Sequence, residues 1–107
     1  AEYIFKHAIT HDVTYNSLLI SRRKTLHLLT AESIEAIFPD QLEELAPNLG
    51  FHFANGGNPQ KAAAYFLQAA EKAERNYANR EALNFYRQAI GQMEKMAESV
   101  QKEKLRT

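Results

Sequence analysis

Residues 62–89 read AAAYFLQAAEKAERNYANREALNFYRQA and carry the same arrangement of small and aromatic residues twice. Both rows are small–aromatic–small at helical spacing, and they are Ala62, Phe66, Ala69 and then Ala82, Tyr86, Ala89. Alanine at such positions lets two antiparallel helices approach closely, and the aromatic ring fills the groove between them. The rows therefore predict helices packed side by side. The buried face of an ordinary helical bundle is the alternative interpretation.

The two rows are also similar to the tetratricopeptide repeat, which has a large–small pair, an aromatic residue and a later small–aromatic–small row. A repeat that begins at Glu43 would use Ala46, Leu49, Gly50, Phe53, Ala62, Phe66 and Ala69. It lacks the terminal proline, because Glu74 stands there. A second register, beginning at Ala63, would use Phe66, Ala69, Ala70, Ala73, Ala82, Tyr86 and Ala89. The registers share a helix and cannot both be complete, so the register stays open. We expect an all-α fold of antiparallel helical hairpins, stacked as a fragment of a right-handed α-solenoid.

Capping and breaking residues predict where the helices begin and end. We expect one helix to begin at Thr10 and a second at Ser21, each with a hydroxyl cap, and Pro39 to end the second. Residues 2–9 fit a short strand or a helical turn equally well, and extended chain, coil or pairing with another copy is expected there. These elements form a predicted N-terminal segment, residues 1–39.

The remainder, residues 40–107, is the predicted repeat region. Asp40 should begin a third helix, with Glu43 completing a capping box and Pro47 kinking it. The run Asn55-Gly56-Gly57 should end that helix, and Asn58-Pro59 should start the next. A break at residues 76–79 separates it from a last helix that reaches about residue 105.

Composition excludes several classes of protein. Thirteen Lys and Arg balance thirteen Asp and Glu, whereas nucleic-acid-binding proteins usually have an excess of positive charge. There is no cysteine, so neither a disulfide nor a thiolate zinc site can form. No apolar run approaches the ~20 residues that a membrane-spanning helix needs. We expect a cytoplasmic protein that does not bind membranes, and the charge balance argues against a dedicated nucleic-acid-binding protein.

No motif predicts catalysis. The four serines, Ser17, Ser21, Ser33 and Ser99, lie outside any Gly-x-Ser-x-Gly elbow. The turn Gly56-Gly57-Asn58-Pro59 lacks the lysine and hydroxyl of a phosphate-binding loop. His7 and His11 are four residues apart, but a packing or hydrogen-bonding role is favoured over a metal site. We predict that the chain has no catalytic residue, no metal and no cofactor.

For two other histidines and a basic cluster, ordinary structural roles are favoured over a binding function. His27 is expected to bond a backbone or carboxylate partner, and His52 to lie on the surface. The run Arg22-Arg23-Lys24 could contact phosphate or an acidic partner, but a solvated helix start is favoured.

A binding face is predicted on the helix before Gly56. In the Glu43 register this face holds Glu44, Asn48, Phe51, His52 and Asn55. Phe51 lies off the main apolar stripe, so it is either a binding hot spot or packs beneath the preceding helix. A short stack leaves its ends open, so a homodimer through Met93, Met96 and Val100 is also expected.

One stretch resembles a known family. The residues that carry the resemblance are Phe5-Lys6-His7-Ala8, Tyr15, Leu18-Leu19, Arg22-Arg23, Leu26-His27 and Glu43-Leu45-Ala46. They look like the segment that opens the tetratricopeptide-like region of large bacterial STAND-type ATPases, which are often fused to adenylate/guanylate cyclase or transcription-regulator domains. The resemblance covers roughly residues 3–95 and includes none of the ATPase or cyclase motifs.

The resemblance implies a non-catalytic interaction or scaffold module whose partner is a protein, either another domain of the parent or a signalling partner. A DNA-binding winged-helix or helix-turn-helix segment in residues 1–38 is the alternative, and a purely structural spacer is a third.

Overall fold

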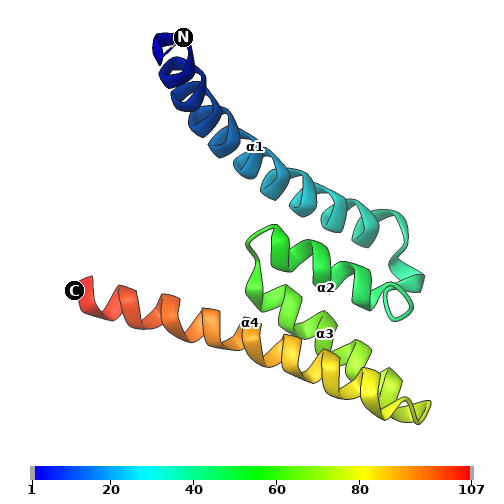
Figure 1. The fold of residues 1–107 in the computed structure, drawn as a ribbon. Helices are drawn as coiled ribbons and strands as arrows, with labels where there is room; N and C mark the ends of the chain where they lie inside the picture. Colours follow the sequence, from blue (N-terminus) through cyan, green and yellow to red (C-terminus); the bar gives the residue numbers. More distant parts are fainter. Residues whose placement is uncertain (1, 107) are drawn as a thin grey trace.

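A computed structural model describes the backbone of residues 2–106 and the side chains of residues 17–101 (Figure 1). Over residues 2–106 the chain is helical except for short connections, and no strand is present there. The elements are α1 (Glu2–Ile37), the 3₁₀ helix η1 (Pro39–Gln41), α2 (Ala46–Asn55), α3 (Pro59–Arg75) and α4 (Asn79–Arg106). The all-α prediction is therefore confirmed.

The N-terminal segment differs from the prediction, because α1 is one continuous helix. Neither the break at Ser21 nor the helix start at Thr10 exists, and residues 2–9 are helical rather than extended. The hydroxyls of Thr25 and Thr30 bond the carbonyls of Ser21 and Leu26, at 3.1 and 2.7 Å. Such bonds to the carbonyl four residues earlier satisfy hydroxyl groups inside a helix, so a hydroxyl residue need not mark a helix start.

Proline residues set both ends of the connection between α1 and α2. Pro39 ends α1 as predicted, because the residue before a proline avoids α-helical geometry. The predicted helix start at Asp40 is wrong, since Asp40 lies in η1 and makes no side-chain cap. Pro47 lies in the first turn of α2 and does not kink the helix. At that position the backbone donor that proline lacks would be unpaired in any case.

The turn between α2 and α3 confirms the predicted one. Gly57 has φ +83°, a left-handed conformation that glycine adopts without steric cost. At Gly56 the backbone of α1 comes close, because a Cβ there would lie 2.9 Å from the Leu28 nitrogen. Asn58 caps α3 by accepting a hydrogen bond from the Lys61 backbone N–H at 3.2 Å. These residues let α3 fold back against α2.

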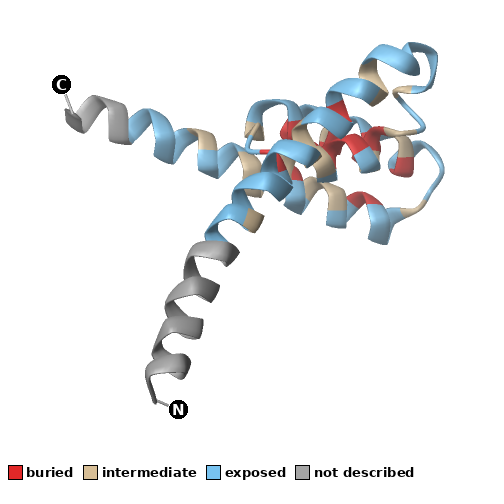
Figure 2. Ribbon diagram, turned by 90° about the horizontal axis from the view of Figure 1, so that it is seen from above, coloured by how far each residue is buried: buried red, intermediate tan, exposed pale blue. Residues whose placement is uncertain are grey.

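Successive helices lie side by side in the order α1, α2, α3, α4 and alternate in direction (Figure 1). The buried residues gather where the four helices meet (Figure 2). The central cluster consists of Ala31, Ala46, Leu49, Phe53, Ala62, Tyr65, Phe66, Ala69 and Ala89. Ala31 belongs to the predicted segment 1–39 but shares this core with residues of the predicted region 40–107. The division of the chain into these two parts stays a prediction.

Aromatic rings fill the spaces between the helices. Phe53 of α2 stacks on Tyr65 of α3 with ring centroids 5.7 Å apart. Between α3 and α4 the pair is Phe66 and Phe85, at 6.5 Å.

The residues predicted for packing occupy this interior with one difference. All but one of them are buried, namely Ala46, Leu49, Gly50, Phe53, Ala62, Phe66, Ala69, Ala82 and Ala89. Gly50 is also a point of close approach, because a Cβ there would lie 2.8 Å from the Phe66 ring. Tyr86 is only half-buried, and its hydroxyl donates to Glu74 at 3.2 Å. Phe85 has the aromatic role that the sequence pattern assigned to Tyr86.

Candidate functional site

The five residues predicted for binding lie on or just before α2. Glu44 lies in the connection before the helix, and the four others, Asn48, Phe51, His52 and Asn55, lie on α2 itself. All are exposed except His52, which is half-buried. The Phe51 side chain is 53% exposed. Spacing of three and four residues places these side chains on one strip of α2 that remains open beside α1.

Three rings meet where α1 crosses this strip. The Nδ1 atoms of His27 on α1 and His52 on α2 are 3.0 Å apart, which is hydrogen-bonding distance. Phe51 meets both imidazoles edge-on, with centroids 5.5 Å from His27 and 5.3 Å from His52. The predicted partner of His27 was therefore wrong, and so was the surface position of His52. For Phe51 the structure combines both alternatives, because the ring is packed on one edge and open on the other.

The contact between the two imidazoles requires that at least one of the two rings is neutral. One ring must donate its N–H and the other must accept, and two imidazoliums would have only donors. Burial lowers the pKa of His52, and the nearby His27 lowers it further. The contact joins α1 to α2 beside the Phe51 ring.

A basic hollow adjoins the three rings. It measures about 310 Å³ and is lined by Ile20, Arg23, Lys24, His27 and Asn55. The Asn55 amide donates to the Phe51 carbonyl at 2.8 Å, which fixes the end of α2. Two members of the predicted basic cluster, Arg23 and Lys24, therefore border the binding strip.

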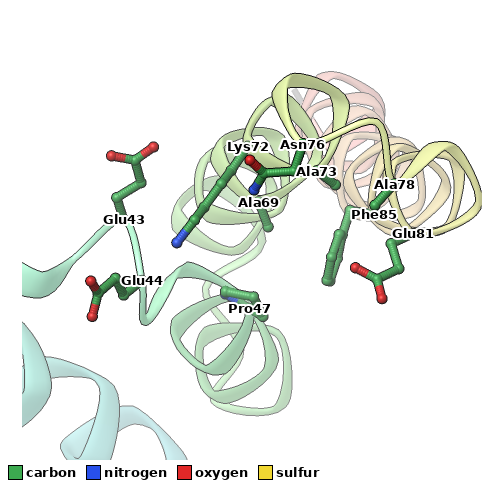
Figure 3. Close-up of a pocket in the computed structure, with 10 residues that line it drawn as sticks. All are labelled: Glu43, Glu44, Pro47, Ala69, Lys72, Ala73, Asn76, Ala78, Glu81 and Phe85. Atoms are coloured by element: carbon green, nitrogen blue, oxygen red, sulfur yellow. The ribbon is translucent and has the colours of Figure 1, made fainter.

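A second hollow of about 250 Å³ lies at the other end of α2, between α2, α3 and α4 (Figure 3). Its lining residues are Glu43, Glu44, Pro47, Ala69, Lys72, Ala73, Asn76, Ala78, Glu81 and Phe85. Figure 3 shows Lys72 reaching from α3 toward the segment that carries Glu43 and Glu44. Sequence reasoning missed this hollow, because it assigned Ala69 and Ala73 only to helix packing. Glu44 alone belongs to both the hollow and the predicted strip.

Polar contacts hold the outer elements to α3. Glu35 of α1 accepts hydrogen bonds from Lys61 at 2.9 Å and from Tyr65. Burial tends to raise the pKa of Glu35, but these two bonds and the Lys61 charge outweigh it and lower the pKa. Arg75 of α3 pairs with Glu43 in the connection before α2. The open strip of α2 therefore lies between anchored elements.

Neither a metal-ligand cluster nor a membrane-spanning helix is found in the described part of the chain. No group of three or more His, Asp or Glu among the described side chains could hold a metal ion. His7 and His11 lie outside the described side chains. Within the described residues, no helix combines the length and apolar character needed to cross a bilayer. Comparisons with protein-family models, curated proteins and solved structures found no match to this chain.

Proposed function

We propose that the chain is a non-catalytic protein-interaction module built from tetratricopeptide-like helical hairpins. The observation that carries the proposal is the strip of α2, where a largely exposed aromatic ring is held by two histidines while the opposite face of α2 is buried. The small residues in the seams support the helical-repeat interpretation, because Ala62, Ala69 and Ala89 are buried between neighbouring helices.

Phe51 is the proposed anchor. Aromatic residues dominate binding energies at interfaces, and a ring that is already ordered loses little conformational entropy when a partner covers it. Asn48 and Asn55 flank the ring and are exposed, so they supply the polar rim. The partner that fits is a protein segment with an apolar side chain and nearby hydrogen-bonding groups.

The resemblance to STAND-type ATPases supports a wider proposal. In this view the module belongs to a larger cytoplasmic bacterial signalling protein, an ATPase or nucleotide cyclase, and couples its sensor and effector parts. No observation favours the DNA-binding alternative, because a helix-turn-helix needs two helices joined by a turn and residues 2–37 form one helix.

Site-specific photo-crosslinking tests the proposed face. Benzoylphenylalanine replaces Phe51 or, as a control, Tyr77, which is 89% exposed in the turn between α3 and α4. Irradiation in cells that make the parent protein should give a discrete adduct at position 51 and none at position 77. With the captured protein purified, Phe51→Ala should weaken binding roughly 30-fold, as expected for a hot spot, while Tyr77→Ala should not. Equal adducts at both positions, or equal effects of both alanines, would contradict the proposal.

A further inference from the structure

A regular apolar stripe runs along α4 beside the face that this helix buries in the core. Large side chains on it remain half exposed, and they are Leu83, Ile90, Met93 and Val100. With Tyr86 and Ala97 they recur at alternating spacings of three and four residues, 83, 86, 90, 93, 97 and 100. This is the a and d pattern of a coiled coil. The residues that α4 buries in the core, Ala82 and Ala89, occupy other positions of the heptad.

The stripe runs along a helix that is longer than its neighbour. α4 has 28 residues and α3 has 17, so α3 cannot cover all of α4. Figure 1 shows the C-terminal part of α4 extending beyond α3. A sustained a and d stripe on an extended helix is the geometry that accepts one further helix.

The stripe is complementary to itself in the antiparallel direction. If Ile90 of one copy faces Met93 of a second copy, Leu83 faces Val100 and Tyr86 faces Ala97, and each pairing occurs twice. In this register the bulky Tyr86 ring meets the smallest residue of the stripe. Layers that pair large with small side chains fill the space between two helices evenly.

The positions of two charged residues also favour antiparallel pairing of two α4 helices. Arg87 and Glu94 are exposed and follow the d positions, on the edge of the stripe away from α3. Neither forms an ion pair with another described side chain. In the antiparallel register Arg87 of one copy comes within about 3 Å along the axis of Glu94 of the other, at ~1.5 Å per residue. In a parallel pair these residues would face the positions of Ala82, Ala89 and Met96, which carry no charge.

We infer that α4 is an interface between two copies of the chain, which pair antiparallel about a twofold axis near Gly91 and Gln92. The interface lies on a different helix from Phe51, so it does not depend on the proposed partner-binding strip.

The first test measures mass against concentration by sedimentation equilibrium. The wild-type chain should approach twice its 12.2 kDa monomer mass as concentration rises. Ile90→Asp should remain monomeric, whereas the matched variant Ile20→Asp, at a 66% exposed position of α1, should still dimerise. Circular dichroism verifies that both variants are folded. A wild-type chain that stays monomeric at its highest soluble concentration overturns the inference and leaves the stripe to a different helix.

The second test uses charge reversal and reports the orientation. Arg87→Glu places two acidic residues opposite each other across the axis, and Glu94→Arg places two basic ones there. Each variant alone should dimerise roughly tenfold more weakly, because two exposed pairs change from attraction to repulsion. An equimolar mixture of the two should restore dimers, since every pair in the heterodimer is again attractive. A mixture no more associated than its components would overturn the antiparallel register.

Discussion

Leucine substitutions at two nearby alanines of α3 test whether the seams need small residues. Ala62 is fully buried in the central cluster, whereas Ala64, two residues further along the same helix, is exposed. Leucine and alanine have similar helix propensities, so the substitutions differ mainly in the space around each side chain. Extra atoms in a packed core force neighbours to move and cost about 1–3 kcal/mol. Ala64→Leu should stay within about 0.5 kcal/mol of the wild type.

Thermal and urea unfolding of both variants give the comparison. At roughly 4–8 °C per kcal/mol for a domain of this size, Ala62→Leu should lower Tm by at least several degrees. Far-ultraviolet circular dichroism before melting reports whether the helices remain. Equal melting temperatures for the two variants would show that position 62 has free space, and the packed seam between α2 and α3 would then be refuted.

Two further predictions concern the turn and the histidine pair. Gly57→Ala should lower the free energy of unfolding by about 1 kcal/mol, because alanine is strained at φ +83°, and Asn at that position should restore part of the loss. The pKa of His52 in the folded chain lies below its usual 6.5, so the unfolded chain binds more protons between the two values. Stability should therefore be greatest above pH 6.5 and fall as the pH drops through the folded-state pKa. Urea unfolding across this pH range should show that the free energy of unfolding depends less on pH in His52→Gln than in the wild type. An equal pH dependence in the two proteins would contradict the role of the histidine pair.

Local signals predicted the turns well. Pro39 ends α1 because its ring restricts the residue before it, and this effect involves only neighbours in the chain. The same holds for Gly57 and for the cap at Asn58, whose roles depend on backbone conformation within a few residues. The positions of these turns could therefore be predicted without knowing the tertiary fold.

Two sequence signals that each fit two different structures led to wrong predictions, at Ser21 and at Pro47. A serine or threonine hydroxyl can cap a helix start or bond a carbonyl within a helix, and the sequence around Ser21 does not distinguish these uses. Pro47 likewise fits a kink or a first helical turn. In both cases the outcome depends on where the neighbouring helix begins, which is set by packing.

The candidate site depends on contacts that the sequence pattern does not contain. His27 and His52 are 25 residues apart, and their meeting depends on how α1 crosses α2. The neighbours Phe85 and Tyr86 both fit the aromatic position, and only the rotation of α4 decides that Phe85 stacks on Phe66. The position of Phe51 off the main apolar stripe could be predicted, but the sequence left its exposure open and did not reveal its contact with two imidazoles.

Aromatic proton NOEs in the wild-type chain test the helix stacking most directly. Residue-specific labelling should reveal cross-peaks between the rings of Phe53 and Tyr65, across α2 and α3, and between those of Phe66 and Phe85, across α3 and α4. Both sets should be present in dilute protein, because these ring pairs lie inside one chain. If the helices are present but neither pair gives a cross-peak, the helices do not stack through these seams.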